Sequence, residues 1–142
     1  MTNTFKIGIL SDGPDQDDWD DLQDILGEAD MPMRPEWNYA PFSGYVDLDD
    51  GSRKGTGLPI ASWHWNAVTA AQRETLKAYC PLLSNEVYIM TPINNTSSGE
   101  IIWGAFNCQM LWPEADEDKD VDNIALGLTI SFRLMEEIGE YL

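Results

Sequence analysis

NIALGLTISFRLMEEI, residues 123–138, alternates from Ile124 to Leu134 between large apolar residues and small or polar ones. The apolar series consists of Ile124, Leu126, Leu128, Ile130, Phe132 and Leu134. Successive side chains of a β-strand point to opposite faces of its sheet, so this pattern predicts a long strand with one buried face. We therefore expect a mainly β fold with this strand as its clearest element.

Three shorter stretches upstream also alternate, namely residues 60–65 (IASWHW), 86–92 (EVYIMTP) and 98–113 (SGEIIWGAFNCQMLWP). In the first of them Ala61, Trp63 and Trp65 share one face, while Ile60, Ser62 and His64 share the other. The third places Ile102, Phe106, Cys108, Met110 and Trp112 on one face, with Gly104 as a gap. We expect all three to be strands, with Trp63, Trp65 and Trp112 as core or interface aromatics.

A helix follows the strand at 60–65. Thr69 and Gln72 have the spacing of a capping box, in which each side chain bonds the other's backbone N–H. The helix continues through Leu76 and Tyr79 and has to end at Pro81. The sequence thus predicts one α-helix of about three turns beside the sheet.

Residues 42–65 predict two strands, at 45–48 and 60–65, around a long polar loop at 49–57. Asp50-Gly51 is a strong turn dipeptide, and Gly55 and Gly57 add flexible points. Protruding loops of this length commonly contact another molecule, so Arg53 and Lys54 are candidate inter-subunit residues.

Residues 1–41 carry ten acidic and two basic residues and are predicted to form an acidic N-terminal arm. Apolar residues at helical spacing predict a short amphipathic helix within 15–29, and the prolines of 31–41 (MPMRPEWNYAP) predict a linker. The expected fold is an antiparallel β-sandwich or barrel at 42–142 with one flanking α-helix and this extended N-terminal arm.

Charge and composition exclude several classes. The formal net charge is −17, which disfavours proteins that bind nucleic acid through its phosphates. Cys80 and Cys108 lie in apolar surroundings without CxxC spacing and are expected to be buried thiols. No stretch approaches the about 20 apolar residues of a membrane helix, so we expect a protein made in the cytoplasm without signal or anchor.

Catalytic and metal motifs are weak. His64 is the single histidine and lacks a nucleophile motif nearby, so it is interpreted as a structural strand residue. The aspartates at 116–122 and 47–51 fail the glycine and glutamate positions of a calcium loop, although weak cation binding stays open. We expect no enzyme and no cofactor.

A set of positions over residues 45–138 resembles small tail proteins of siphophages and related prophages. The matching positions are Asp50-Gly51, Gly57, Pro59, Trp63, Trp65, Gln72, Leu76, Cys80-Pro81, 87–91, Trp112-Pro113 and 130–133. In the tail-tube branch of that family, a small β-sandwich with a flanking helix forms rings of six copies, which stack into a hollow tube for DNA. The resemblance carries no catalytic motif.

The resemblance implies a virion protein that forms a homo-oligomeric ring, contacts other tail proteins and lets DNA pass without specific binding. An acidic channel wall repels phosphates, so the candidate lumen acids are Asp47, Asp49, Asp50, Asp116, Asp118 and Asp120. The long region 1–41 leaves a tail terminator, adaptor or baseplate component as alternatives. A carbohydrate-binding β-sandwich, with Trp63, Trp65, Trp103 and Trp112 as stacking faces, is a further alternative.

Overall fold

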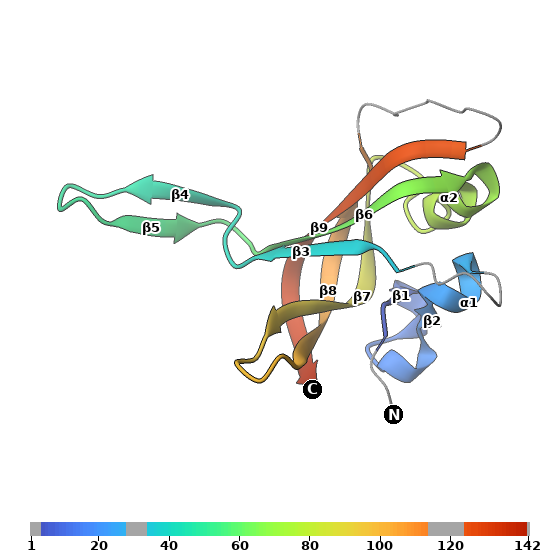
Figure 1. Cartoon of the computed structure of the whole chain (residues 1–142), viewed down its shortest axis with the longest axis horizontal. Helices are drawn as coiled ribbons and strands as arrows, with labels where there is room; N and C mark the ends of the chain where they lie inside the picture. Colours follow the sequence, from blue (N-terminus) through green and yellow to red (C-terminus); the bar gives the residue numbers. More distant parts are fainter. Residues whose placement is uncertain (1–3, 28–33, 114–123, 142) are drawn as a thin grey trace.

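The protein is described by a computed structural model covering residues 4–27, 34–113 and 124–141, shown in Figure 1 as a curved sheet from which a hairpin projects. The main sheet is formed by β1 (Lys6–Ile9), β2 (Asp20–Asp21), β3 (Glu36–Ala40), β6 (Ile60–Thr69), β7 (Ser84–Asn95), β8 (Ile101–Leu111) and β9 (Ile124–Tyr141). The hairpin consists of β4 (Gly44–Asp47) and β5 (Arg53–Thr56). Two α-helices, α1 (Leu22–Leu26) and α2 (Ala70–Lys77), complete the fold with 3-10 turns at Leu10–Asp12 and Gln16–Asp18.

The strands of the main sheet follow the order β2-β1-β7-β8-β9-β6-β3, and every described pairing is antiparallel. β3, at one edge, also contacts β7, so the sheet curls around its own concave face. The predicted class, a mainly β antiparallel fold with a flanking helix, is confirmed. Within the described residues, no helix is long and apolar enough to cross a membrane.

β9 holds the sheet together because it pairs with two neighbours along different parts of its length. Its first part pairs with β6, from Thr69↔Ile124 to Ile60↔Arg133. Its second part pairs with β8, from Leu111↔Ser131 to Trp103↔Tyr141, with two register shifts. The strand predicted at 123–138 is thus confirmed and continues to Tyr141. The register shifts are β-bulges, which increase the local twist of the sheet.

The core is built around Trp63, whose side chain is fully buried. Its ring meets Phe132 at a centroid distance of 4.6 Å and Phe5 at 5.7 Å, in edge-to-face geometry. Its indole Nε1 donates a hydrogen bond to Thr91 Oγ1 at 2.9 Å, so the one polar atom of the ring is satisfied in the interior. The predicted burial of the face that carries Ala61, Trp63 and Trp65 is confirmed.

α2 begins where the sequence places it but ends at Lys77, so it is about two turns long instead of the three predicted, and Tyr79 lies beyond it. Thr69 accepts a hydrogen bond from Gln72 N at 3.2 Å, while Thr69 N donates to Gln72 Oε1 at 2.9 Å, so the capping box is confirmed. Leu76 is fully buried against the sheet. Lys77 Nζ donates to the carbonyls of Cys80 and Leu82, which satisfies acceptors just beyond the last turn.

The N-terminal region differs from the predicted arm, because β1 is an integral strand between β2 and β7. The side chains of this region that are buried in the common core are Phe5, Ile7, Trp19, Leu22 and Leu26. Trp19 stacks on Tyr88 of β7 at 5.3 Å. The division at residue 41 therefore does not separate two packing units. A four-residue strand alternates too briefly to stand out in sequence, and its burial depends on the partner strand β7.

The amphipathic helix predicted within 15–29 is shorter than expected. Asp15 Oδ1 accepts from Asp17 N at 3.0 Å, and Asp21 Oδ1 accepts from Gln23 N at 2.8 Å. Aspartate side chains that bond the backbone two residues on begin new turns instead of continuing a helix, so only α1 is α-helical here. The predicted linker likewise contains β3, an edge strand between Pro35 and Pro41, where missing N–H donors are tolerated.

Candidate functional site: a projecting arm and a groove

The stretch predicted as a long loop, 49–57, contains a strand, β5, and together with β4 it forms a β-hairpin. β4 and β5 pair from Gly44↔Thr56 to Asp47↔Arg53. Around the turn, Gly51 N donates to Leu48 O at 3.0 Å, and Gly51 has a φ of 89°, which favours glycine. The Asp50-Gly51 turn is confirmed, but β4 pairs with β5 and not with β6. We call residues 42–58 the arm.

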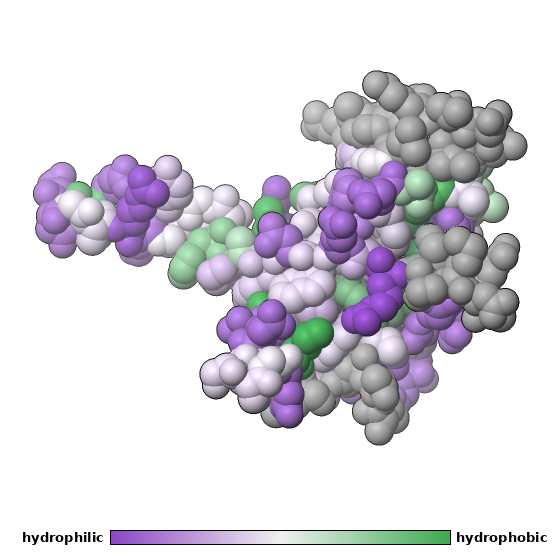
Figure 2. All heavy atoms as spheres, viewed as in Figure 1, coloured by the Kyte–Doolittle hydropathy of each residue, from purple (hydrophilic) through white to green (hydrophobic). Residues whose placement is uncertain are grey.

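The arm stands away from the rest of the molecule, as Figure 1 shows, and β4 and β5 contact chiefly each other. Its five exposed apolar residues are Phe42, Tyr45, Val46, Leu48 and Leu58. Apolar surface at the root of the arm is visible in Figure 2. An isolated two-stranded hairpin is marginally stable in water, so exposed apolar residues on such an element favour a partner surface.

One face of the arm is occupied by contacts within the arm. The Arg53 guanidinium lies 4.1 Å from the centroid of the Tyr45 ring, and Arg53 Nε donates to Asp47 Oδ1 at 2.8 Å. The Phe42 ring packs against Gly55, where an added Cβ would lie 2.2 Å from the ring. Of the two predicted inter-subunit residues, Arg53 is therefore engaged by its own chain.

The opposite face of the arm is open. Val46 and Leu48 are 46% and 44% exposed, and Lys54 lies across the hairpin from Val46. Within the described residues, the Lys54 side chain makes no hydrogen bond or ion pair. We call Val46, Leu48 and Lys54 the open face; it combines two apolar side chains with one cation that has no described partner.

Of the six candidate lumen acids, the structure describes three, all in the arm. Asp47 pairs with Arg53, and Asp49 and Asp50 lie at the exposed tip of the arm. Hydrogen bonds from the Ser52 hydroxyl and backbone N–H hold the pKa of the Asp50 carboxyl below its usual value. Asp116, Asp118 and Asp120 lie outside the described residues. Their position relative to a channel stays a prediction.

His64 lies on the half-exposed side of β6, facing neighbouring polar groups. Its Nδ1 is 2.7 Å from Thr129 Oγ1 on β9, and its Nε2 is 3.2 Å from Asn66 Oδ1. Both ring nitrogens are therefore engaged in hydrogen bonds across the surface of the sheet. This geometry agrees with the interpretation of His64 as a structural residue.

The tryptophans proposed as stacking faces for sugar are in the core. Trp63, Trp65, Trp103 and Trp112 are all at most 6% exposed. Lys77 Nζ lies 4.9 Å from the Trp112 ring centroid and covers that ring. Sugar stacking requires open ring faces, so these four residues do not support the carbohydrate-binding alternative.

The two cysteines are buried and free, as predicted. Burial raises the pKa of the Cys108 thiol above its usual value, and burial is also the main cause of the raised pKa of Cys80. Both thiols are therefore protonated and unreactive at neutral pH. Among the side chains that the structure describes, no group of three His, Cys, Asp or Glu residues is placed to hold a metal ion.

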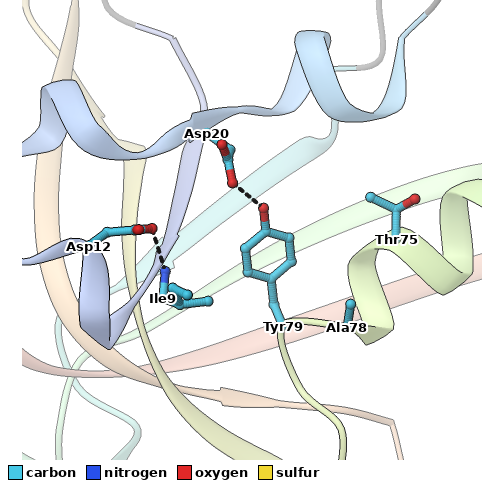
Figure 3. Close-up of a pocket in the computed structure, with 6 residues that line it drawn as sticks. All are labelled: Ile9, Asp12, Asp20, Thr75, Ala78 and Tyr79. Atoms are coloured by element: carbon cyan, nitrogen blue, oxygen red, sulfur yellow. Dashed lines mark hydrogen bonds between the residues drawn. The ribbon is translucent and has the colours of Figure 1, made fainter.

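A groove of about 510 Å³ lies between the end of β1 and the last turn of α2 (Figure 3). Its lining residues are Ile9, Asp12, Asp20, Thr75, Ala78 and Tyr79. The Tyr79 hydroxyl donates to Asp20 Oδ2 at 2.5 Å, and Asp12 Oδ2 accepts from Ile9 N at 3.1 Å. Burial, and then the Asp20 hydrogen bond, raise the pKa of Tyr79.

The groove carries both carboxylates and exposed apolar side chains. Ile9 is 42% exposed and its neighbour Leu10 is 46% exposed, beside the carboxylates of Asp12 and Asp20. Sequence reasoning missed this site, because it joins residues 9–20 to residues 75–79. Phe5, Ile7 and Ile9 do alternate, but the run is too short to predict a strand without its partner β7.

Comparisons of the chain with protein-family models, curated proteins and solved structures found no match.

Proposed function

We propose that this protein is a structural subunit of a phage tail, which assembles with copies of itself into rings that stack into a tail tube around a channel for DNA. The observation that carries the proposal is the arm. The arm is a two-stranded hairpin with exposed apolar side chains, and the rest of the chain does not cover them. A segment of this kind gains stability when a second molecule buries it.

The main sheet supports the same proposal. It curls around one buried apolar core that includes Trp63, Trp65 and Trp103, so it supplies a folded unit from which the arm can reach a neighbour. Repeated contact between an arm and a different surface of the next copy is a heterologous interface, which closes into a ring when the rotation per copy allows it.

The net charge of −17 fits passage of DNA without binding. An acidic wall repels phosphates, whereas clustered lysine and arginine would retain them. The negative charge is compatible with a DNA channel because it disfavours DNA binding. Many proteins without a channel are also acidic, so the charge does not identify one. The resemblance of residues 45–138 to siphophage tail proteins adds the specific assembly, six copies per ring in stacked rings.

Electron microscopy of the purified protein tests the proposal. We expect light scattering to show association as concentration rises, and negative-stain images to show rings or tubes with a central channel. A protein that stays monomeric at every concentration, alone and with other tail components, contradicts the proposal.

DNA retention gives a second readout. Assembled protein is expected to bind no DNA at low ionic strength, where the Debye length is longest and a basic site would bind best. If the undescribed acids face the channel, replacing Asp116, Asp118 and Asp120 with lysine creates DNA retention that salt reverses. Tight DNA binding by the unaltered protein at low salt contradicts an acidic conduit.

A further inference from the structure

The open face of the arm has a defined chemistry. Val46 and Leu48 project from the hairpin opposite the face that Tyr45, Asp47 and Arg53 fill. Lys54 adds a positive charge without a described partner. A complementary surface therefore offers apolar contact together with negative charge.

The groove beside α2 has that chemistry. Ile9 supplies exposed apolar surface in the groove, Leu10 is the exposed residue next to it in the chain, and Asp12 and Asp20 supply negative charge. The groove is a hollow and the arm is a narrow projection, as Figure 1 shows, so the arm is the part of a neighbouring copy that can enter it. In Figure 3 the Ile9, Ala78 and Tyr79 side chains lie beside one another around the hollow.

The arm and the groove are placed for association between copies. Figure 1 shows the arm projecting from one end of the long axis, while α2 and α1 lie toward the other end. The arm of one copy therefore cannot enter its own groove without refolding. Contact between opposite ends of identical molecules is heterologous and builds a ring or a filament.

We propose that the open face of the arm, formed by Val46, Leu48 and Lys54, docks in the groove formed by Ile9, Asp12, Asp20 and Tyr79 of a neighbouring copy. This inference rests on the proposed function for its partner, a second copy of the same chain. Lys54 approaches the two carboxylates, and Val46 and Leu48 cover Ile9 and Leu10. The hairpin thereby gains the covered face that it lacks in a single copy.

A second acidic surface on the molecule serves as the comparison. The last part of β9 has no strand partner on the side opposite β8 beyond the hydrogen bond from Leu134 N to Pro59 O, within the described residues. Met135 in this part of β9 is 39% exposed, which is similar to the 42% exposure of Ile9. Glu136, the next residue, supplies a negative charge. Docking of the arm along this edge is the outcome that competes with docking in the groove.

Disulfide trapping distinguishes the two surfaces. We prepare Val46→Cys, Ile9→Cys and Met135→Cys as single variants of the full chain, since native Cys80 and Cys108 are fully buried. Mixing Val46→Cys with Ile9→Cys under mild oxidation is expected to give a cross-linked pair that neither variant gives alone. Mixing Val46→Cys with Met135→Cys is expected to give no such pair. The reverse pattern overturns the proposal in favour of the β9 edge.

Charge exchange gives an independent readout of association. Lys54→Glu is expected to weaken self-association at least about fivefold, as is Asp12→Lys, because each places like charges at the contact. The double variant recovers most of the loss, since each interface then contains one of each charge. Asp12→Asn keeps an acceptor for Ile9 N and is expected to show a smaller effect. Glu136→Lys is the matched control and is expected to leave association unchanged.

The outcomes separate this inference from the proposed function. Cross-linking of positions 46 and 9 without rings or tubes in micrographs supports the docking site and contradicts the tube. Rings or tubes that form without this cross-link, and without sensitivity to Lys54→Glu or Asp12→Lys, support the assembly and overturn the docking site. If neither the cross-link nor rings or tubes are found, both the docking site and the proposed function are overturned.

Discussion

β6 with β9 in the body and β4 with β5 in the arm are both antiparallel pairs, yet their faces are covered in opposite ways. Trp63 and Phe132 project from the body pair into the core and are fully buried. Val46 and Leu48 project from the arm into solvent. The backbone pairing is of the same kind in both, so the difference lies in the side chains and in what covers them.

This difference shows which part of the molecule is complete. The body pair has its apolar face buried and its polar face linked by His64 and Thr129. The arm pair satisfies one face through Arg53, Tyr45 and Asp47 and leaves the other open. Strand pairing alone contributes little stability without a covered face. The body is therefore expected to fold by itself, and the arm to depend on a neighbour.

Trp63→Ala is expected to break the body and has the largest effect. The substitution removes the ring contacts with Phe132 and Phe5 and leaves Thr91 without its indole donor. The free energy of unfolding is expected to fall by about 3 to 5 kcal/mol, a large share of a small domain's stability. Urea unfolding followed by tryptophan fluorescence measures the change.

Trp63→Phe is the matched control for this substitution. It keeps an aromatic ring in the core and loses the hydrogen bond to Thr91, so a smaller loss is expected. A folded Trp63→Ala protein with a loss below about 1 kcal/mol would show that the core does not depend on this ring.

Thr69→Ala tests the junction between β6 and α2, with an intermediate effect. The alanine removes the acceptor for Gln72 N, one of two hydrogen bonds in the capping box. Loss of such a cap costs about 1 kcal/mol of unfolding free energy. Thermal unfolding by circular dichroism measures it, and Thr69→Ser, which keeps the hydroxyl, should stay close to the unaltered protein. Equal losses for both variants would argue that the methyl group, not the cap, matters.

The elements predicted correctly from sequence are those whose signals are local. The alternation in β9 and β6 and the spacing of Thr69 and Gln72 specify a buried strand face and a helix start without knowledge of the partner. β1 and β3 are short, and their place depends on β7 and β6. Their role as strands is decided by pairing, which no local pattern reveals.

The candidate site was predictable in part for the same reason. The Asp50-Gly51 turn indicates a protruding segment, and Arg53 and Lys54 are the basic residues within it. Only the pairing of β4 with β5 separates the two residues, because it places Arg53 over Tyr45 and leaves Lys54 on the open face. The groove joins Asp12 and Asp20 to Tyr79 through tertiary packing, so it had no contiguous signature.

Removal of the arm is expected to have only a small effect on the stability of the body. Ala40 and Ile60 lie directly opposite each other in the sheet, so Asn-Gly in place of residues 42–58 can join them through Pro41 and Pro59. The free energy of unfolding is expected to change by less than about 0.5 kcal/mol, since the arm contacts chiefly itself. Assembly is expected to be lost, which sedimentation velocity measures. A large loss of stability would show that the arm supports the body.

Glu137→Gln in β9 is the smallest of the expected effects and acts within the body. Burial and then the Glu140 carboxylate raise the pKa of Glu137 above its ordinary value of 4.5. The unfolded chain therefore releases this proton at lower pH than the folded one, and stability falls as pH rises through that window. Glutamine removes the repulsion and can still donate to Glu140. At neutral pH the variant should be more stable by at most about 0.5 kcal/mol, the scale of exposed charge pairs.

The pH dependence identifies the cause of this small effect. Below the ordinary glutamate pKa the folded and unfolded chains both hold the proton, so the variant and the unaltered protein are expected to be equally stable there. Glu136→Gln removes the same charge one residue away and controls for net charge, because relief of general repulsion would raise both variants alike. Urea unfolding at pH 3.5 and pH 7, taken as about one unit below and well above the carboxyl range, measures the difference. A Glu137→Gln protein that is less stable at neutral pH would show that the ionised pair is held by favourable contacts on the sheet, and that β9 is tolerant of charge where its second edge is open.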